Sequence, residues 1–164
     1  PQLELMQKAS SSMQQKLRWN LFDSPLGKAF YPYARSRKFL ESFSKKQLFA
    51  NANQVDEEWL GTLEKGAKNP QSKYAVFSFL AGFWRQDFSQ AIAEIHQPTL
   101  VLVGSQASTI SKTDKIETPE QRMNSYLKYL PQAKGHQISG RNVLPYESTA
   151  EFVKAVSEFL REIN

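Results

Sequence analysis

The stretch ISGRNVLPYES, residues 138–148, carries the side chains with the most distinctive chemistry. An apolar strand ends there, Gly140 turns the chain, and a proline and a helix start follow. The guanidinium of Arg141 keeps its proton near neutral pH, so Arg141 cannot act as a general base. Arg141 either clamps a carboxylate or phosphate through two hydrogen bonds, or is held by Glu147 or a loop carbonyl. The sequence leaves both roles open.

A second turn, Gly104-Ser105-Gln106-Ala107, follows the apolar run TLVLV. Ser105, Ser108 and Ser111 occupy this turn and the loop after it. Their hydroxyls either bind a ligand or belong to a solvated polar loop.

Aromatic residues before this turn form another candidate site: Tyr74, Phe77, Phe79, Phe83, Trp84 and Phe88. They either line a pocket for a long apolar ligand or form the core of a helical region. In the first case Tyr74, Phe77 and Trp84 are candidate ligand contacts.

The absence of cysteine excludes disulfides, thiol catalysis and thiolate ligands for zinc. His136 lies in the predicted strand KGHQIS and is either a displaced base or an ordinary strand residue. His96, the other histidine, is expected to be structural. We expect neither a metal nor a cofactor. With 40% hydrophobic and 23% charged residues, no membrane-length apolar run and no visible signal peptide, the sequence is typical of a soluble cytoplasmic protein.

The positive charge is concentrated in the first half of the chain. Residues 1–87 contain 13 Lys+Arg and 8 Asp+Glu, whereas residues 88–164 contain 8 of each. The basic stretch 35–46, with Phe39, Leu40 and Phe43, either rests on a membrane surface or buries these side chains in a helical core. Because no stacking motif accompanies the basic residues, nucleic acid is not an expected partner.

Residues 1–90 have the spacing of helices only, and residues 91–164 alternate between helices and strands. Ser24 before Pro25, and Asp56, are expected helix N-caps. Parallel strands are predicted at 99–103 and 135–139, and the first is expected to be buried on both faces. A final helix is expected after a capping box of Ser148 and Glu151. Its inward stripe is predicted to be Phe152, Val153, Val156, Phe159 and Leu160.

Two parallel strands do not form an independent sheet. An apolar strand with an open edge needs a neighbour on that edge. We therefore expect additional strands from sequence upstream of this chain.

The order of these segments resembles the C-terminal half of the α/β-hydrolase fold. The resemblance covers the whole chain and is strongest at HQPTLVLVG, PEQRMNSYLKYLP and GRNVLPYESTAEFVKAVSEFL. It implies an α/β fold, with a helical cap at 1–90 and the C-terminal part of the hydrolase core at 91–164. The core would contain two parallel strands with flanking helices, and the N-terminal half would come from upstream sequence or a second chain.

The resemblance also implies a triad of serine, acid and histidine. No G-x-S-x-G is present, so the nucleophile would lie in the other half. Ala107 occupies the position of the acid in the G-x-x-D turn, and Arg141 that of the histidine in the G-H turn. Asp114 replaces the acid only if its loop folds back.

These observations predict a hydrolase-related protein that acts on or binds an apolar ester or lipid-like molecule, with a non-standard or lost triad. The alternative is a non-catalytic protein that uses the cap and its cavity for a lipophilic ligand or a protein partner. The basic helices leave a peripheral membrane contact open.

Overall fold

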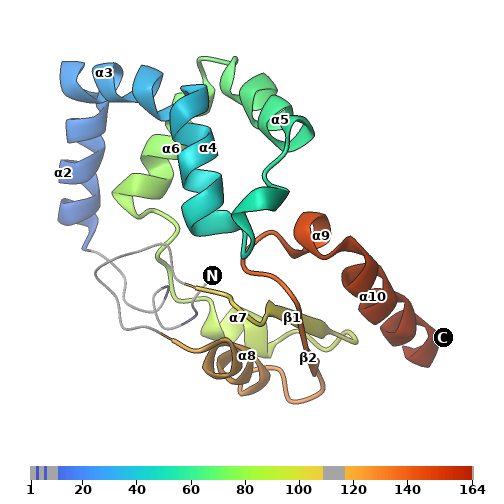
Figure 1. The fold of residues 1–164 in the computed structure, drawn as a ribbon. Coiled ribbons are helices and arrows are strands. Elements are labelled where there is room, and N and C mark those ends of the chain that lie inside the picture. The colour runs from blue at the N-terminus through green and yellow to red at the C-terminus, as the bar shows by residue number, and fades with distance from the viewer. Residues whose placement is uncertain (1–2, 4–5, 7–10, 109–116, 164) are drawn as a thin grey trace.

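The computed structural model describes residues 3, 6, 11–108 and 117–163. The first part of the chain folds into helices that lie beyond one end of a small sheet (Figure 1). These helices are α2 (Ser12–Asp23), α3 (Pro25–Ala34), α4 (Arg37–Phe43), the π-helical turn η1 (Ser44–Leu48), the 3-10 turn η2 (Ala52–Gln54), α5 (Glu57–Ala67) and α6 (Ser72–Ala81). The predicted helical character of this region is confirmed for its described residues. The division into two domains stays a prediction.

Both predicted N-cap residues lie at helix starts, but only Asp56 caps its helix with its side chain. The Asp56 carboxylate accepts a hydrogen bond from the backbone N–H of Trp59 at 2.8 Å and caps α5. Ser24 is the N-cap of α3, with Pro25 in the first turn. Its hydroxyl, however, donates to the carbonyl of Leu21 at 2.5 Å, so it satisfies the end of α2 instead of the start of α3. One residue therefore joins two helices.

The core of the helical region is aromatic. Phe77 on α6 is only 1% exposed and packs against Phe22 of α2 and Tyr31 of α3, with ring centroids 5.6 and 6.1 Å apart. Aromatic rings in such offset and edge-on arrangements stabilise a core beyond their buried area. These contacts tie α2, α3 and α6 together.

The second part of the chain has a mixed α/β structure. It contains α7 (Ser89–Ala93), β1 (Leu100–Gly104), α8 (Pro119–Leu127), β2 (Lys134–Ile138), α9 (Leu144–Glu147) and α10 (Thr149–Ile163). β1 and β2 pair in parallel, with Leu100 opposite Lys134 and Gly104 opposite Ile138. The predicted parallel pair is confirmed, although each strand is displaced by one residue from its predicted range.

Helices cover both faces of the two-stranded sheet. On one face, α8 lies so close that a side chain at Gly135 would overlap Met123 and Leu127. On the other face, Ile138, Leu144 and Ala155 of α10 form a buried cluster. Further partly buried side chains pack on this cluster: Leu102 and Phe152. The sheet is thus the middle layer of three.

The strands are less buried than a central position in a sheet would make them. Leu100, Val101 and Leu102 are only half-buried, and most of β2 is exposed. The final helix is also less buried than predicted: Val153 and Leu160 of its predicted inward stripe are 54% and 47% exposed. The described sheet has only two strands and is too narrow to cover these positions.

The predicted capping box of Ser148 and Glu151 is not formed. The Ser148 hydroxyl donates to the carbonyl of Ser139 at 2.7 Å, and the Glu151 carboxylate accepts from the N–H of Ser139 at 2.9 Å. Both side chains therefore bind the end of β2, because α9 directly precedes α10 and leaves no free helix start. Hydrogen bonding to Ser139 lowers the pKa of Glu151.

The chain crosses itself closely at Gly104. A Cβ atom at this position would overlap the carbonyl oxygen of Gly140 and approach that of Arg141 within 2.7 Å. Only glycine lets the two turns after β1 and β2 come this close.

We predict that Gly104→Ala lowers the free energy of unfolding by roughly 1–3 kcal/mol, because the added methyl group overpacks two backbone segments. Gly61→Ala on α5 is the matched control, since nothing lies within 4 Å of the added atom. It should be neutral or stabilise the helix by about 0.5–1 kcal/mol. Denaturant unfolding of both variants is the measurement, and equal midpoints would contradict the prediction.

Candidate functional site

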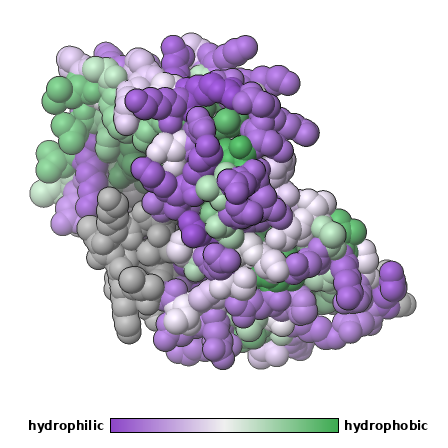
Figure 2. Space-filling view, in the orientation of Figure 1, coloured by the Kyte–Doolittle hydropathy of each residue, from purple (hydrophilic) through white to green (hydrophobic). Residues whose placement is uncertain are grey.

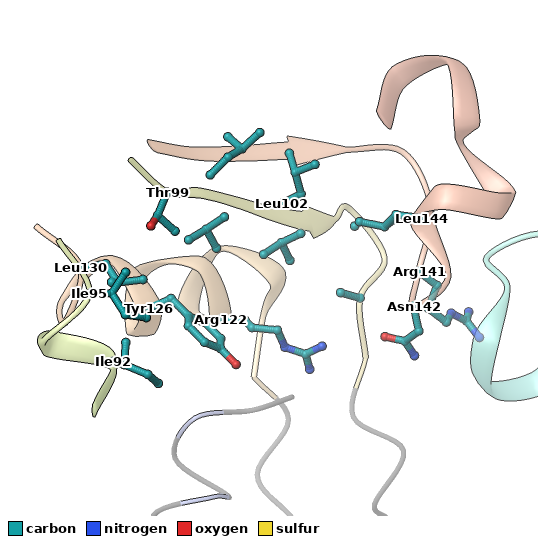
Figure 3. A pocket seen from close by; sticks show the side chains of 15 residues that line it. Ile92, Ile95, Thr99, Leu102, Arg122, Tyr126, Leu130, Arg141, Asn142 and Leu144 are labelled. Atoms are coloured by element: carbon teal, nitrogen blue, oxygen red, sulfur yellow. The ribbon is translucent and has the colours of Figure 1, made fainter. Parts of the chain in front are cut away.

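The turns after β1 and β2 meet at the carboxyl ends of the strands. The N–H of Gln106 donates to the carbonyl of Gly140 at 2.9 Å, and the N–H of Ser105 donates to that of Ile138 at 2.8 Å. As a result, Ala107 and Arg141 line the same cavity, which has a volume of about 450 Å³ (Figure 3). The structure brings together the two positions that the sequence singled out in separate turns.

The cavity has an apolar end and a polar end. Figure 3 shows Ile92, Ile95 and Leu130 at the end near Thr99. At the other end, Arg122 reaches in from α8, and Arg141 and Asn142 lie beyond it. Apolar walls with a few convergent polar groups are typical of a small-molecule site.

Two polar side chains on α8 lie at the cavity. Arg122 is 9% exposed, and its Nε donates to the Glu117 carboxylate at 3.3 Å. Burial raises the pKa of Tyr126, while the positive charge of Arg122 acts in the opposite direction. Tyr126 is therefore a protonated phenol near neutral pH, able to donate a hydrogen bond.

Arg141 and Asn142 bind the end of η1. Arg141 Nη1 donates to the carbonyl of Lys46 at 2.9 Å, and the Asn142 side chain donates to that of Gln47 at 2.7 Å. The backbone N–H of Asn142 donates to the carbonyl of Leu48 at 3.0 Å. Three consecutive carbonyls at a helix end are thus satisfied, and a cation there is favoured by the helix dipole.

Glu147 joins the two parts of the chain from a buried position. It is 8% exposed, and one carboxylate oxygen accepts from the N–H of Ala50 at 2.8 Å while the other accepts from the N–H of Arg141. Its backbone carbonyl accepts from the Gln54 side chain at 3.1 Å. Gly140, with φ of 111°, makes room for this carboxylate, because a Cβ would lie 2.7 Å from Oε1. Arg141 is therefore held through its backbone N–H by Glu147 and through its guanidinium by the Lys46 carbonyl of η1.

An aromatic cluster lies beside Glu147. The rings of Phe49, Trp59 and Tyr146 are 5.0–5.9 Å apart, and the Tyr146 hydroxyl donates to the Asp56 carboxylate at 2.7 Å. This hydrogen bond raises the pKa of Tyr146 to about 12. The N–H of Trp59 and, second, the Tyr146 hydroxyl lower the pKa of Asp56.

The other predicted ligand contacts lie elsewhere. Tyr74 stacks on Trp19 in the helical region, Phe77 fills its core, and Trp84 stacks on Phe79. None of them lines the cavity that holds Ala107 and Arg141. Ser105 is exposed and Ser108 half-buried, and neither contributes to the cavity wall. Ser111 and Asp114 fall outside the described residues.

Neither of the chain's two histidines reaches the cavity. His136 is exposed and lies on the face of the sheet covered by α10, next to Ala155 and Phe159. His96 is exposed in the segment before β1. Within the part of the chain that the structure describes, no group of three His, Cys, Asp or Glu side chains could hold a metal.

Sequence reasoning missed Arg122, Tyr126 and Asn142. Arg122 and Tyr126 lie on α8, where the spacing of apolar residues gives no sign of a cavity. The apolar residues that line the cavity beside them come mostly from other elements. Asn142 had a weak signal, because it follows Arg141 in the same turn.

The aromatic residues of the basic stretch 35–46 pack on one another and on Tyr33 of the neighbouring helix. Phe39 stacks on Phe43 at 6.0 Å and meets Tyr33 edge-on, and both phenylalanines are half-buried. A more exposed apolar surface lies on α2 and α3, at the upper left of Figure 2. It contains Met13, Leu17, Leu21 and Leu26. Among the described helices, none is both long and apolar enough to cross a bilayer.

Comparison with known proteins adds no family assignment. No protein-family model and no curated protein matches the chain. Conclusions about its activity therefore rest on its own residues.

We predict that Glu147→Ala lowers the free energy of unfolding by roughly 1–3 kcal/mol, because two backbone N–H groups lose a buried acceptor. Glu147→Gln should cost less than the alanine change, since one side-chain oxygen still accepts a hydrogen bond. Glu158→Ala, at an exposed position of α10, is the matched control and should stay within about 0.5 kcal/mol of wild type. Urea unfolding measures all three, and a Glu147→Ala variant as stable as the control would refute the joining role of Glu147.

The Asp56 carboxylate should make stability depend on pH. Its pKa in the folded state is below its ordinary value of 3.8, so its contribution is complete above that value and is lost as the pH falls through the folded pKa. We expect wild type to be more stable than Asp56→Asn at pH 6, with the difference disappearing in acid. Tyr146→Phe should keep most of the pH dependence, because the Trp59 N–H is the main cause of the shift. Thermal unfolding from pH 2 to 7 is the measurement, and identical profiles for wild type and Asp56→Asn would contradict it.

Proposed function

We propose that this chain is the cap and C-terminal core of an α/β-hydrolase-like protein that binds an apolar ester or lipid-like molecule without a standard catalytic triad. The ligand would lie at the carboxyl ends of the strands, between the turn at Ala107 and the turn at Arg141. Ligands of open α/β sheets generally bind at these ends. The family assignment itself rests on the resemblance of the sequence.

One observation carries the proposal: the acid and base positions implied by the resemblance adjoin one cavity, and neither holds a group able to do that chemistry. Ala107 has no carboxylate to orient a base. The Arg141 guanidinium keeps its proton and is bound to the carbonyl of Lys46. Because no histidine reaches the cavity, a displaced base of that type has no support.

The cavity favours a ligand with an apolar body and a hydrogen-bond acceptor. Its apolar walls would exclude water from a hydrocarbon chain. Arg122, Tyr126 and Asn142 carry donors suited to an ester carbonyl or a carboxylate. Because the protein would keep this cavity but lack a general base, binding would be its main activity. A nucleophile and an oxyanion site in the N-terminal half would still give a low residual rate.

A non-catalytic role in assembly is the second candidate. The hydrogen bonds of Arg141, Asn142 and Glu147 make this region a rigid junction between cap and core. In that role the cavity would receive a protein partner, and Arg141 would have an architectural function only.

Ligand binding is tested on the complete protein, meaning this chain joined to its proposed N-terminal half. A dansyl-labelled undecanoic acid should bind with saturation, and Ala107→Met should weaken it about tenfold by filling the cavity, a change of 1.4 kcal/mol. Ala93→Met adds the same side chain on exposed α7 and should have no effect. Fluorescence titration is the measurement. Equal affinities for both variants would exclude this cavity as the ligand site.

Restoring the triad residues should restore hydrolysis. In the complete protein we expect Ala107→Asp combined with Arg141→His to raise the rate on p-nitrophenyl butyrate by up to roughly 100-fold, the lower range for general acid–base catalysis. Each single variant should stay near wild type, because acid and base act as a unit. Release of nitrophenolate is the readout. A double variant that binds the dansyl probe but gains no rate would show that these positions are not the acid and base.

A further inference from the structure

A second hollow lies on the helical part of the chain, where α4 and η1 run from the end of α3 toward the sheet (Figure 1). Its volume is about 340 Å³, and among the described residues none lines both this hollow and the cavity at Ala107 and Arg141. Tyr33 of α3 forms one wall. The other wall, from α4 and η1, consists of Lys38, Phe39, Ser42, Phe43, Lys46 and Gln47. We call this hollow the α4 groove.

The larger wall of the α4 groove has a cationic row beside an aromatic row. Residues four apart share a helix face, so one row contains Lys38, Ser42 and Lys46. The adjacent row begins with Phe39 and Phe43, whose rings stack at 6.0 Å with their planes 9° apart. The ring of Tyr33 meets Phe39 edge-on at 5.3 Å from the opposite wall. The groove therefore offers an aromatic surface with positive charge along one side.

The charge of the groove is not compensated. Lys38 and Lys46 are exposed, and no ion pair among the described residues involves either of them. Their chain neighbours Arg37 and Lys45 are instead paired with glutamates, at 2.5 Å in each case. Among the described residues that line the groove, none is acidic. Two ammonium groups beside one aromatic surface favour an anionic occupant.

The wall of the groove is held in place from behind. Its last part is the π-helical turn η1, in which the N–H of Phe49 donates to the carbonyl of Ser44 at 3.1 Å. Such turns are rare and are often found at functional positions. The guanidinium of Arg141 binds the carbonyl of Lys46, which fixes the backbone beside the groove. A preorganised wall loses little conformational freedom when a ligand binds.

We propose that the α4 groove binds a flat aromatic anion of the aryl carboxylate class. Its rings would lie against Phe39 and Phe43, and its charged group would lie on the side of Lys38 and Lys46. The volume of the groove is at the lower end of the range of small-molecule sites, about 300–1,000 Å³, which suits a compound of two fused rings. This site goes beyond the proposed function and does not depend on it.

A membrane surface fits the groove less well. Helices that lie on a bilayer insert an exposed apolar face among the lipids. Phe39 and Phe43 are instead half-buried and line a hollow, which a flat layer of headgroups does not enter. The polar side chains of Ser42 and Gln47 line the same wall, and hydrocarbon chains would leave them without hydrogen bonds.

Titration of the protein with 2-naphthoate, followed by naphthalene fluorescence, tests the charge of the site. Binding should saturate, and Lys46→Gln should weaken it up to about fivefold, the upper range for an exposed ion pair. Lys45→Gln is the matched control and should have no effect, because Lys45 pairs with Glu41 and does not line the groove. Neutral 2-naphthalenemethanol should bind wild type and Lys46→Gln equally. Binding without saturation, or equal weakening by the two lysine variants, would overturn the proposal.

Filling the groove gives an independent readout. Ser42→Trp should weaken 2-naphthoate by at least about tenfold, whereas Thr62→Trp on exposed α5 should not, with folding of both checked by circular dichroism. Ala107→Met should leave 2-naphthoate binding unchanged, since Ala107 lines the other cavity. Unchanged affinity of a folded Ser42→Trp variant, or a loss in Ala107→Met, would refute binding in the α4 groove.

Co-sedimentation with vesicles of phosphatidylserine and phosphatidylcholine covers the membrane alternative. Wild type and Lys46→Gln should sediment alike if the groove serves a small anion. Sedimentation that is lost in Lys46→Gln, together with no binding of 2-naphthoate, would overturn the proposal in favour of a membrane surface. Because none of these readouts uses the dansyl probe, failure of this site and failure of the proposed function are distinguishable.

Discussion

The buried carboxylate of Glu147 holds this structure together. Its two oxygens accept hydrogen bonds from the N–H groups of Ala50 and Arg141, which belong to the helical part and to the turn after β2. A buried carboxylate is costly unless each oxygen is satisfied, so the positions of these two backbone segments are linked. The contacts of Arg141 and Asn142 with the carbonyls of η1 follow from that link. The aromatic cluster of Phe49, Trp59 and Tyr146 packs beside the same junction.

This linkage explains why an arginine stands in the turn after β2. A histidine at position 141 would face the cavity as a base but is too short to place a cation on the carbonyl of Lys46 as Arg141 does. The position therefore joins the helical part of the chain to the α/β part, and the proposed ligand site has a fixed cation at its edge. At this position the guanidinium supplies a rigid junction and no proton transfer. Ala107 lines the same cavity and has no carboxylate that could orient a base.

The narrow sheet accounts for the remaining irregular features. β1 has the composition of a strand in the middle of a sheet, yet only one of its edges is paired among the described residues. The same lack of width leaves Val153 and Leu160 of α10 exposed on a helix whose spacing is strongly amphipathic. A third strand beside β1 would pair the open edge and widen the surface on which the flanking helices pack.

The sequence by itself determined the local structure. Helical spacing, Asp56 as a cap and the run TLVLV were enough to predict helices followed by two parallel strands, because these signals act between residues close in the chain. Tertiary structure alone decided the roles of the polar residues. Arg141 and Lys46 are 95 residues apart, and so are Asn142 and Gln47, so no spacing rule connects them. Ser148 and Glu151 show the same limit: their pattern predicts a helix cap, but the nearby end of β2 offered both side chains better-placed partners.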